Sequence, residues 1–416
     1  MNDTLNRSSD CCIIIMAFGP MGHFNYHTKY WADVMTQKKI NFQIYDFQPL
    51  MAKYNYKTNM VNDPLTDTEA VKVTPIISYS QLEKLLMELD KDNSLIVTHI
   101  KYDYFTFRIY RLISKNRLRY CVYNAFGSYI NEKVSYEERF KMDGLELRTK
   151  FTLKNLIAAL FRCKSIKDIL IVGGDVFTHI PKKLLGINNA DYILLSGHTT
   201  DSLKTNFAFP IDENTKKISC HFLDYDRYLI NLENPLKINE KQVVYVSPNL
   251  FIHQSDLPDL KPEVYYRSLK KLFYILEKKG YSIIVAAHPR DQISELQQYL
   301  DEWEVVYGNT DKLIRDSEYA IISGSSITNM SLLYGRPFIM ITSDSISQTG
   351  RTLNDFLVDL SNKLGKKLLN IDHLTDNIEL DEYLNSDQTL VEAFISSKLD
   401  QNIPKLTQCQ ILLDNL

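Results

Sequence analysis

Two short polar motifs, each directly after an apolar run, contain the side chains of this chain that are best suited to chemistry. The first motif is AHPR at 287–290 and the second is SGSS at 323–326. The imidazole of His288 and the guanidinium of Arg290 offer hydrogen-bond donors and positive charge. Ser325 and Ser326 offer hydroxyl groups and, if they open a helix, free backbone N–H groups that attract anions. Together the motifs predict a phosphate-binding site.

The apolar runs before these motifs indicate where the site lies in the fold. They are SIIVA at 282–286 and YAII at 319–322, both rich in β-branched residues and typical of buried parallel strands. After the second motif, the spacing of Ile327, Met330 and the leucines at 332 and 333 predicts a helix that begins at the serines. The site is therefore expected at the carboxyl edge of a parallel sheet, where nucleotides commonly bind.

Strand-like runs alternate with helical patterns along the whole chain, which predicts the α/β class with mostly parallel sheets and right-handed crossovers. The economical interpretation is two Rossmann-like domains that face a cleft. The predicted strands of the first half are 11–18, 41–46, 94–99, 119–123, 169–172 and 191–195, with helices at 26–36, 80–90, 105–115 and 152–162. In the second half the predicted strands are 242–246, 282–286, 304–307, 319–322 and 337–341, with helices at 263–279 and 293–300.

The chain has 416 residues, of which 44% are hydrophobic, so it is long enough for more than one core. Residues 211–241 are rich in Asp, Asn, Lys and Glu and are interpreted as the connection between the halves. The expected division is 1–215 for the first Rossmann-like domain and 216–345 for the second. A helical segment, 346–416, is expected to pack back across the domains.

Composition excludes several classes of protein. With 48 basic and 51 acidic residues and a net charge of −3, the chain shows no nucleic-acid footprint. Residues 91–119 are interpreted either as a local basic patch or as a solvated helix face. Six cysteines with neither zinc spacing nor a disulfide framework favour a reducing compartment. The apolar run at 11–18 is shorter than the ~20 residues of a membrane span, so we expect a cytosolic chain without signal peptide or transmembrane helix.

The two halves, with a His-Pro pair after one strand and a Ser-Ser pair before a later helix, resemble the bacterial sialyltransferases. They also resemble the related capsule or O-antigen glycosyltransferases of the GT-B fold. The resemblance covers residues 243–341. In those families the histidine and the serine pair hold the phosphate of a CMP-activated sugar acid. The resemblance therefore implies this role for His288, Ser325 and Ser326, with Pro289 shaping the turn.

One motif of those families is missing. They carry Asp/Glu-Asp/Glu-Gly after a strand of the first domain, and it supplies the base that deprotonates the acceptor hydroxyl. The matching place here is YNAFGSY at 123–129, which keeps a glycine but has no carboxylate. Asp143 is a later candidate, with Glu132, Glu137 and Glu138 nearby. Otherwise the base lies elsewhere, the donor or stereochemistry differs, or the site is inactive.

Other short motifs fit a functional and a structural interpretation. Gly22 and His23, within GPMGH at 19–23, either approach a ligand or form a plain turn, and GGD at 173–175 is similar. The loop at 247–256, with Asn249, either touches a substrate or is an ordinary Ser-Pro turn. DYD at 224–226 matches an Asp-x-Asp metal-nucleotide pattern, but its place in the connection predicts a solvated loop. No Walker loop, nucleophile elbow, His-Glu-x-x-His or Cys-x-x-Cys occurs, which argues against covalent catalysis and structural zinc.

The residues and the resemblance predict a glycosyltransferase of bacterial capsule or O-antigen synthesis. The expected donor is a CMP-linked nonulosonic acid, whose leaving phosphate His288 and Arg290 would stabilise. No metal or other cofactor is expected, because the protein's own donors offset the phosphate charge. The donor-site candidates are His288, Pro289, Arg290, Ser325, Ser326 and Asn249.

The first domain is expected to bind a glycan acceptor, free or lipid-linked, with peripheral contact at the inner face of the cell membrane as a further expectation. The residues assigned to this side are Gly22, His23 and Asn124, with Asp143 as the catalytic candidate beside His288. Three alternatives stay open. The first is a UDP- or GDP-sugar donor. The second is a different reaction, either transfer of glycerol phosphate or pyruvate or the epimerisation of a nucleotide sugar. The third is an inactive nucleotide-binding homologue.

Overall fold

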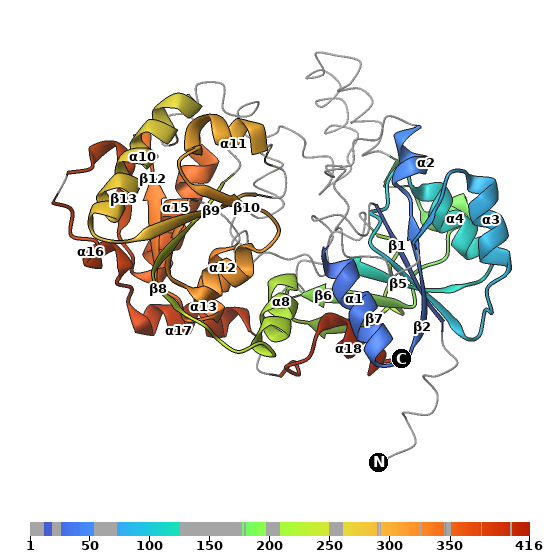
Figure 1. Cartoon of the computed structure of the whole chain (residues 1–416). Helices are drawn as coiled ribbons and strands as arrows, with labels where there is room; N and C mark the ends of the chain where they lie inside the picture. Colours follow the sequence, from blue (N-terminus) through green and yellow to red (C-terminus); the bar gives the residue numbers. More distant parts are fainter. Residues whose placement is uncertain are drawn as a thin grey trace, which may run out of the picture. The chain divides into compact units, whose positions relative to one another are not determined.

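The computed structural model describes the chain in two compact units (Figure 1). The described residues are 12–18, 26–53, 73–124, 177–178, 180–196, 209–248, 261–288, 291, 293–323, 327–344, 346, 351–375, 377–399 and 402–416. Described residues up to Leu223, together with 403–416, form the first unit, and those from Asp224 to Asn402 form the second. The statements below concern these residues.

The first unit is built on a parallel sheet of seven described strands in the order β3-β2-β1-β4-β5-β6-β7. The strands are β1 (Cys12–Ala17), β2 (Asn41–Asp46), β3 (Val73–Pro75), β4 (Ser94–Thr98), β5 (Arg119–Asn124), β6 (Tyr192–Ser196) and β7 (Lys216–Cys220). The helical elements are α1 (Tyr26–Gln37), α2 (Gln48–Ala52), α3 (Tyr79–Met87), α4 (Phe107–Lys115), the 3-10 helix η5 (Lys182–Leu185) and α18 (Gln408–Leu413). β1, which is CIIIMA, is buried on both faces, as a central parallel strand requires.

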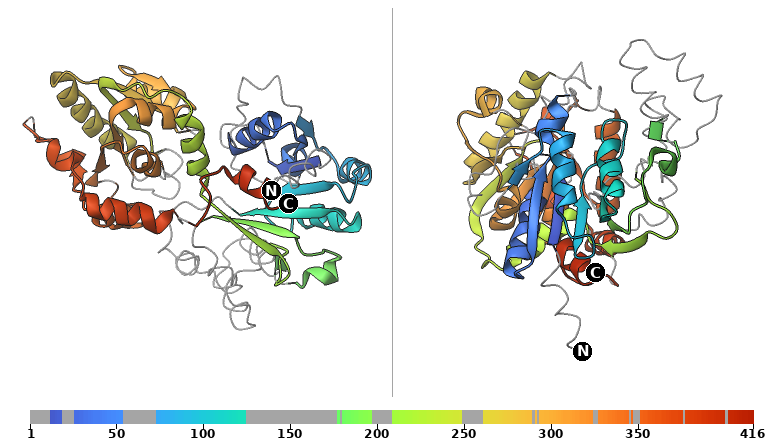
Figure 2. Two further views of the ribbon diagram at one scale, coloured as in Figure 1. Left: turned by 90° about the horizontal axis from the view of Figure 1, so that it is seen from below. Right: turned by 90° about the vertical axis from the view of Figure 1, so that its right-hand side faces the viewer.

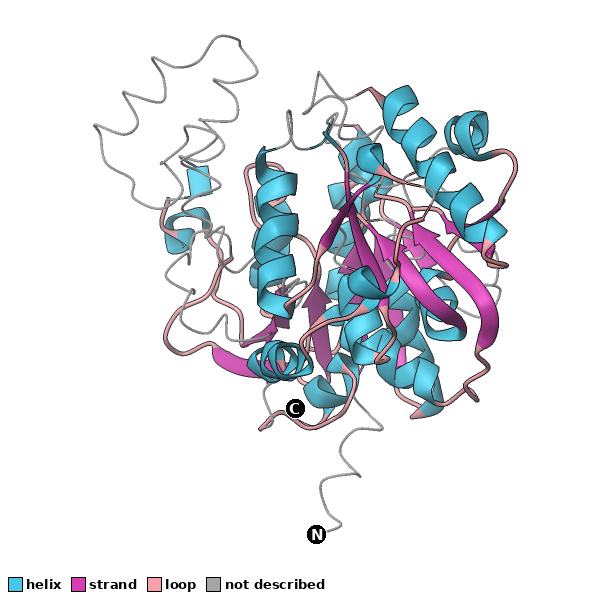
Figure 3. Ribbon diagram, turned by 90° about the vertical axis from the view of Figure 1, so that its left-hand side faces the viewer, coloured by secondary structure: helices cyan, strands magenta, loops and turns pink. Residues whose placement is uncertain are grey.

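The second unit has a parallel sheet of six described strands in the order β10-β9-β8-β11-β12-β13. They are β8 (Asn239–Val246), β9 (Ser282–Ala286), β10 (Glu304–Val306), β11 (Ser317–Ile322), β12 (Phe338–Thr342) and β13 (Leu368–Asn370). The helices are α8 (Leu223–Leu232), α10 (Pro262–Lys278), α11 (Ile293–Leu300), α12 (Thr310–Asp316), α13 (Thr328–Leu333), α15 (Arg351–Leu364), η6 (Ile371–His373), α16 (Asp381–Leu384) and α17 (Gln388–Lys398). Figure 3 shows the helices of this unit on both sides of its strands.

Each sheet has a hydrophobic core on both faces. In the second unit, Tyr245 and Ile321 belong to the core under α10, while Val246 and Ile322 belong to the core on the opposite face. This alternation follows from the two-residue period of a strand. The pair of parallel, doubly covered sheets confirms the α/β class and the two Rossmann-like domains predicted from the sequence.

The structure divides the chain differently from the predicted boundaries at 215/216 and 345/346. Residues 216–220 form β7, which pairs with β6 and completes the first sheet, so the change of unit falls between Leu223 and Asp224. Of the predicted tail, 346–402 belongs to the second unit and only 403–416 joins the first. Both views in Figure 2 show the dark-red C-terminal helix α18 against the strands of the first sheet. There Tyr123 of β5 donates a hydrogen bond to Gln408, at 2.6 Å.

Some predicted elements need correction. The connection expected at 211–241 contains β7 and α8, and the Asp-x-Asp residues lie in α8 instead of a solvated loop. Asp226 is 1% exposed, since α8 packs onto the second unit. The short edge strands β3 and β13 were not predicted either. The strand expected at 169–172 and the helix at 152–162 lie outside the described residues.

Candidate functional site

The carboxyl edge of the second sheet carries a polar residue after each described strand. Parallel registers align the strand ends, because Val246 of β8 pairs with Ala286 of β9 on one side and with Ile322 of β11 on the other. This places His288 and Ser323, from the two motifs, on one edge of the sheet, with β8 between their strands. The polar residues after β8, β9, β10, β11, β12 and β13 are Ser247, His288, Tyr307, Ser323, Ser343 and Asp372.

His288 is held in a tight turn closed by Asp291. The backbone N–H of His288 donates to Oδ2 of Asp291 at 2.7 Å, and the backbone N–H of Asp291 donates back to the carbonyl of His288 at 2.8 Å. The hydroxyl of Tyr307 donates to the carbonyl of Asp291. These bonds tie the residues after β9 to those after β10, so the backbone that carries His288 is fixed from two strands.

Asp291 is a buried carboxylate with an unusual proton affinity. Its side chain is 7% exposed. Burial raises its pKa to about 6, although hydrogen bonds from the Ser247 side chain and the His288 N–H act in the opposite direction. The charge of Glu295, on α11, adds to the rise. The group therefore titrates near neutral pH at the edge where the phosphate site is predicted.

A layer of tyrosines lies under the middle of this edge. The hydroxyls of Tyr245 and Tyr265 are 3.2 Å apart and form a hydrogen bond. Both rings are fully buried. Burial raises the pKa of Tyr265 to about 12, so these hydroxyls stay protonated at neutral pH. The tyrosine pair under the edge is thus a neutral, hydrogen-bonded part of the core.

A second carboxylate, Asp372 in η6, organises the far side of the edge. It accepts hydrogen bonds from Ser268 of α10 at 2.5 Å, from the Ser343 hydroxyl at 2.7 Å and from the Asp344 backbone N–H at 2.7 Å. Burial alone would raise its pKa, but the hydrogen bonds from Ser268, Ser343 and Asp344 bring the pKa below the ordinary value. Asp372 therefore stays ionised where Asp291 begins to take up a proton.

Several predicted donor-site residues lie outside the described residues. They are Asn249, Pro289, Arg290, Ser325 and Ser326. The helix expected at the serines begins at Thr328 in the described chain, as α13. His288 and Ser323 are the parts of the two motifs whose positions the structure gives, and it brings them to one edge.

In the first unit, Asn124 ends β5 at the corresponding carboxyl edge and is half-buried. Next to it, the ring of Tyr123 stacks on His99, with centroids 4.3 Å apart, and Trp31 meets both rings edge-on. His99 follows β4 directly. The other first-domain candidates, Gly22, His23 and Asp143, lie outside the described residues.

Sequence reasoning missed Asp372, Ser343 and His99. Each follows a strand, which is the signal that could have identified them. β13, with the sequence LLN, is too short to be recognised as a strand in the sequence. The polar residues that follow it were therefore not identified as residues of the edge.

The described edge offers hydrogen-bond donors, an imidazole and one titrating carboxyl, an arrangement that can bind and orient a phosphate ester. Among the described residues no group of three or more His, Cys, Asp or Glu side chains is placed to hold a metal ion. No described helix is long and apolar enough to cross a membrane.

No protein-family model matches this chain, and no curated protein matches it significantly. Solved structures match over nearly its whole length at low identity. A Phytolacca americana UGT2 complexed with UDP-2fluoro-glucose and pterostilbene is 12% identical, with 98% of this chain and 99% of that chain covered and a TM-score of 0.47. A Methanocaldococcus jannaschii UDP-GlcNAc 2-epimerase in complex with UDP-GlcNAc and UDP is 11% identical, with 92% and 98% covered and a TM-score of 0.39. Likeness of this degree is a matter of general fold.

Proposed function

We propose that this chain is a glycosyltransferase that binds a nucleotide-activated sugar at the carboxyl edge of its second sheet. The observation that supports this most is the placement of His288 and Ser323 on either side of β8, beside the switch of strand order between β8 and β11. Ligands of open parallel sheets bind outside such a point. His288, held in the turn that Asp291 closes, would offer its imidazole to the leaving phosphate, and Ser323 would offer its hydroxyl from the other side of β8.

The finer proposal is a CMP-linked nonulosonic acid as donor and a surface glycan of the capsule or O-antigen type as acceptor. It rests on the His-Pro and Ser-Ser pattern of the sequence, with Arg290, Ser325 and Ser326 as the other phosphate ligands. The first sheet would bind the acceptor, with Asn124 on that side. The protein would work in the cytoplasm, at the inner face of the membrane where lipid-linked glycans are available.

Thermal unfolding of the full chain with CMP, CDP, UDP and GDP tests this proposal. A nucleotide at 100 times its dissociation constant adds about 2.7 kcal/mol to the stability of the folded state. We expect stabilisation by CMP that the His288→Ala variant loses. A matched control is His373→Ala, in η6 of the same unit, because His373 is 70% exposed, pairs with Asp344 and follows β13, the edge strand on the other side of the sheet from β9. This variant should keep the CMP effect.

Each other outcome changes the proposal in a defined way. Stabilisation by UDP or GDP alone, again lost in His288→Ala, would keep the transferase and replace the donor class. Stabilisation that survives in His288→Ala would move the site away from the β8 edge. If no nucleotide stabilises the protein, the nucleotide-sugar proposal is wrong.

A further inference from the structure

A pair of aromatic rings projects from the first unit between β4 and α4. Tyr104 is 55% exposed and Phe105 is 42% exposed, although Phe is a residue type that usually lies buried. Their ring centroids are 5.5 Å apart in an edge-on arrangement. Behind them, Phe177 lies 5.4 Å from Tyr104 and 5.0 Å from Phe107, so the exposed rings stand on a packed aromatic base.

The loop that presents these rings has a defined conformation. The carboxylate of Asp103 accepts the backbone N–H groups of Phe105, at 2.8 Å, and Thr106, at 3.0 Å. The hydroxyl of Thr106 donates to the carbonyl of Lys101 at 2.6 Å. The hydroxyl of Tyr79, on α3, donates to the Phe105 carbonyl at 3.1 Å. The aromatic tip is therefore held outward by hydrogen bonds, and little ordering is needed when it binds a partner.

Two elements beside the tip, α4 and η5, contain basic and no acidic residues. α4, with the sequence FRIYRLISK, contains no acidic residue, and its Arg108 and Arg111 are exposed. Arg108 lies over the ring of Tyr79, 4.5 Å from its centroid, beside the tip. Arg111 reaches the end of η5. Its Nε lies 3.8 Å from the position that a Cβ would occupy on Gly186, the residue directly after η5. α4 lies within residues 91–119, for which the sequence left open a basic patch or a solvated helix face.

η5 adds further apolar and basic side chains to those of the tip and α4. Leu184 is 78% exposed and Lys183 is exposed beside it. Lys182 lies over the ring of Tyr102, 5.1 Å from its centroid, which joins η5 to the aromatic base. We call the set Tyr104, Phe105, Arg108, Arg111, Lys183 and Leu184 the tip surface.

We propose that the tip surface docks on an anionic lipid bilayer. Aromatic rings with an apolar body are favoured at the interface of a bilayer, and clustered Lys and Arg are attracted by anionic headgroups. The charge of the surface complements such a membrane, although the whole chain has a net charge of −3. This inference deepens the proposed function, since it names the partner surface through which a lipid-linked acceptor would be reached.

Flotation of the full chain with vesicles tests the inference. We expect binding to vesicles of phosphatidylglycerol and phosphatidylcholine, and at least tenfold weaker binding to phosphatidylcholine alone. The Arg108→Gln/Arg111→Gln double variant should bind the anionic vesicles about thirtyfold more weakly, since each basic residue near the surface contributes about 1 kcal/mol. The Tyr104→Ser/Phe105→Ser variant should lose binding that persists at high salt, because the apolar contribution is not screened.

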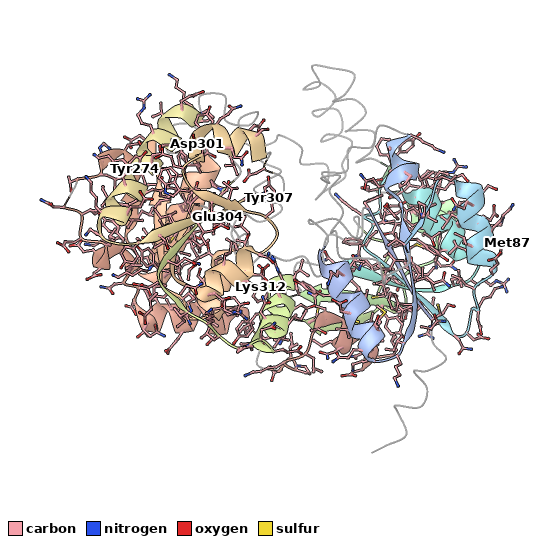
Figure 4. The ribbon with its side chains drawn as sticks, viewed as in Figure 1. Met87, Tyr274, Asp301, Glu304, Tyr307 and Lys312 are labelled. Atoms are coloured by element: carbon pink, nitrogen blue, oxygen red, sulfur yellow. The ribbon has the colours of Figure 1, made fainter. Side chains whose placement is uncertain are left out.

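Matched controls separate this surface from general stickiness. Met87→Ser removes a side chain that is 67% exposed at the other end of α3 from Tyr79 (Figure 4). Lys237→Gln/Lys312→Gln removes two exposed charges from the second unit. Both variants should bind vesicles like the wild type. The inference is wrong if the wild type ignores anionic vesicles, if the controls lose as much as the tip variants, or if the tip binds single-stranded RNA in preference to vesicles.

The vesicle test and the nucleotide test fail independently. The tip variants should keep their thermal stabilisation by CMP, and His288→Ala should keep its vesicle binding. Vesicle binding without any stabilisation by nucleotides would support the docking surface and contradict the proposed glycosyltransferase function.

Discussion

Replacing Asp311 with alanine should lower the free energy of unfolding of the second unit by about 3 to 5 kcal/mol. Asp311, on α12, is 3% exposed and accepts hydrogen bonds from Arg227 at 3.0 Å and from Asn231 at 2.6 Å. Both partners lie on α8, and the Arg227 side chain is only 11% exposed. The variant would bury this guanidinium without the counter-charge it now faces. Denaturant-induced unfolding of wild type and variant at one pH measures the difference.

Two further variants show whether the buried charge is the cause. Asp301→Ala removes a carboxylate that is 68% exposed on the surface of the same unit (Figure 4), and the change should stay within about 1 kcal/mol. Arg227→Met/Asp311→Leu replaces the pair by apolar side chains and should be more stable than Asp311→Ala. A double variant as unstable as the single one would mean that packing around α8, and not the unpaired charge, dominates.

The same contacts explain why the region around α8 was misjudged from the sequence. DYDRYLINL looks polar enough for a connection, and its acidic residues suggested a solvated loop. What buries it is a set of partners distant in the chain, such as Asp311 and Tyr334, which meet Asn231 from α12 and from the end of α13. Local periodicity contains no information about such partners. The central strands, by contrast, were predicted to within a few residues, because a strand such as β9, SIIVA, is an unbroken apolar run after its first residue.

The candidate site was predictable to the extent that it follows strand ends. His288 and Ser323 reach one edge because the parallel registers align β9, β8 and β11, and that alignment follows from the alternation of strands and helices. The role of Asp291, by contrast, could not be predicted from the sequence. Its bond to the His288 N–H depends on the exact path of the turn, which the sequence HPRD does not reveal.

Asp291 should make the protein less stable as the pH rises from about 4 to 7. Burial raises its pKa from 3.8 to about 6, so between these values the folded chain binds more protons than the unfolded chain. The free energy of unfolding then falls with rising pH, by about 3 kcal/mol in total for this group. About 1 kcal/mol of this falls between pH 5 and pH 7, where denaturant-induced unfolding can follow it.

Asp291→Asn isolates this titration, because asparagine can still accept the His288 N–H but cannot ionise. From pH 5 to pH 7 the stability of the variant relative to the wild type should rise by about 1 kcal/mol. Asp372→Asn is the matched control. The pKa of Asp372 is lowered, so its stabilising charge is already complete at pH 5 and is lost only below its ordinary range. The difference between this variant and the wild type should therefore be the same at both pH values. If the stability difference between Asp291→Asn and the wild type is also the same at pH 5 and pH 7, the carboxyl of Asp291 is hydrated in solution. It then does not close the turn of His288 as a buried group.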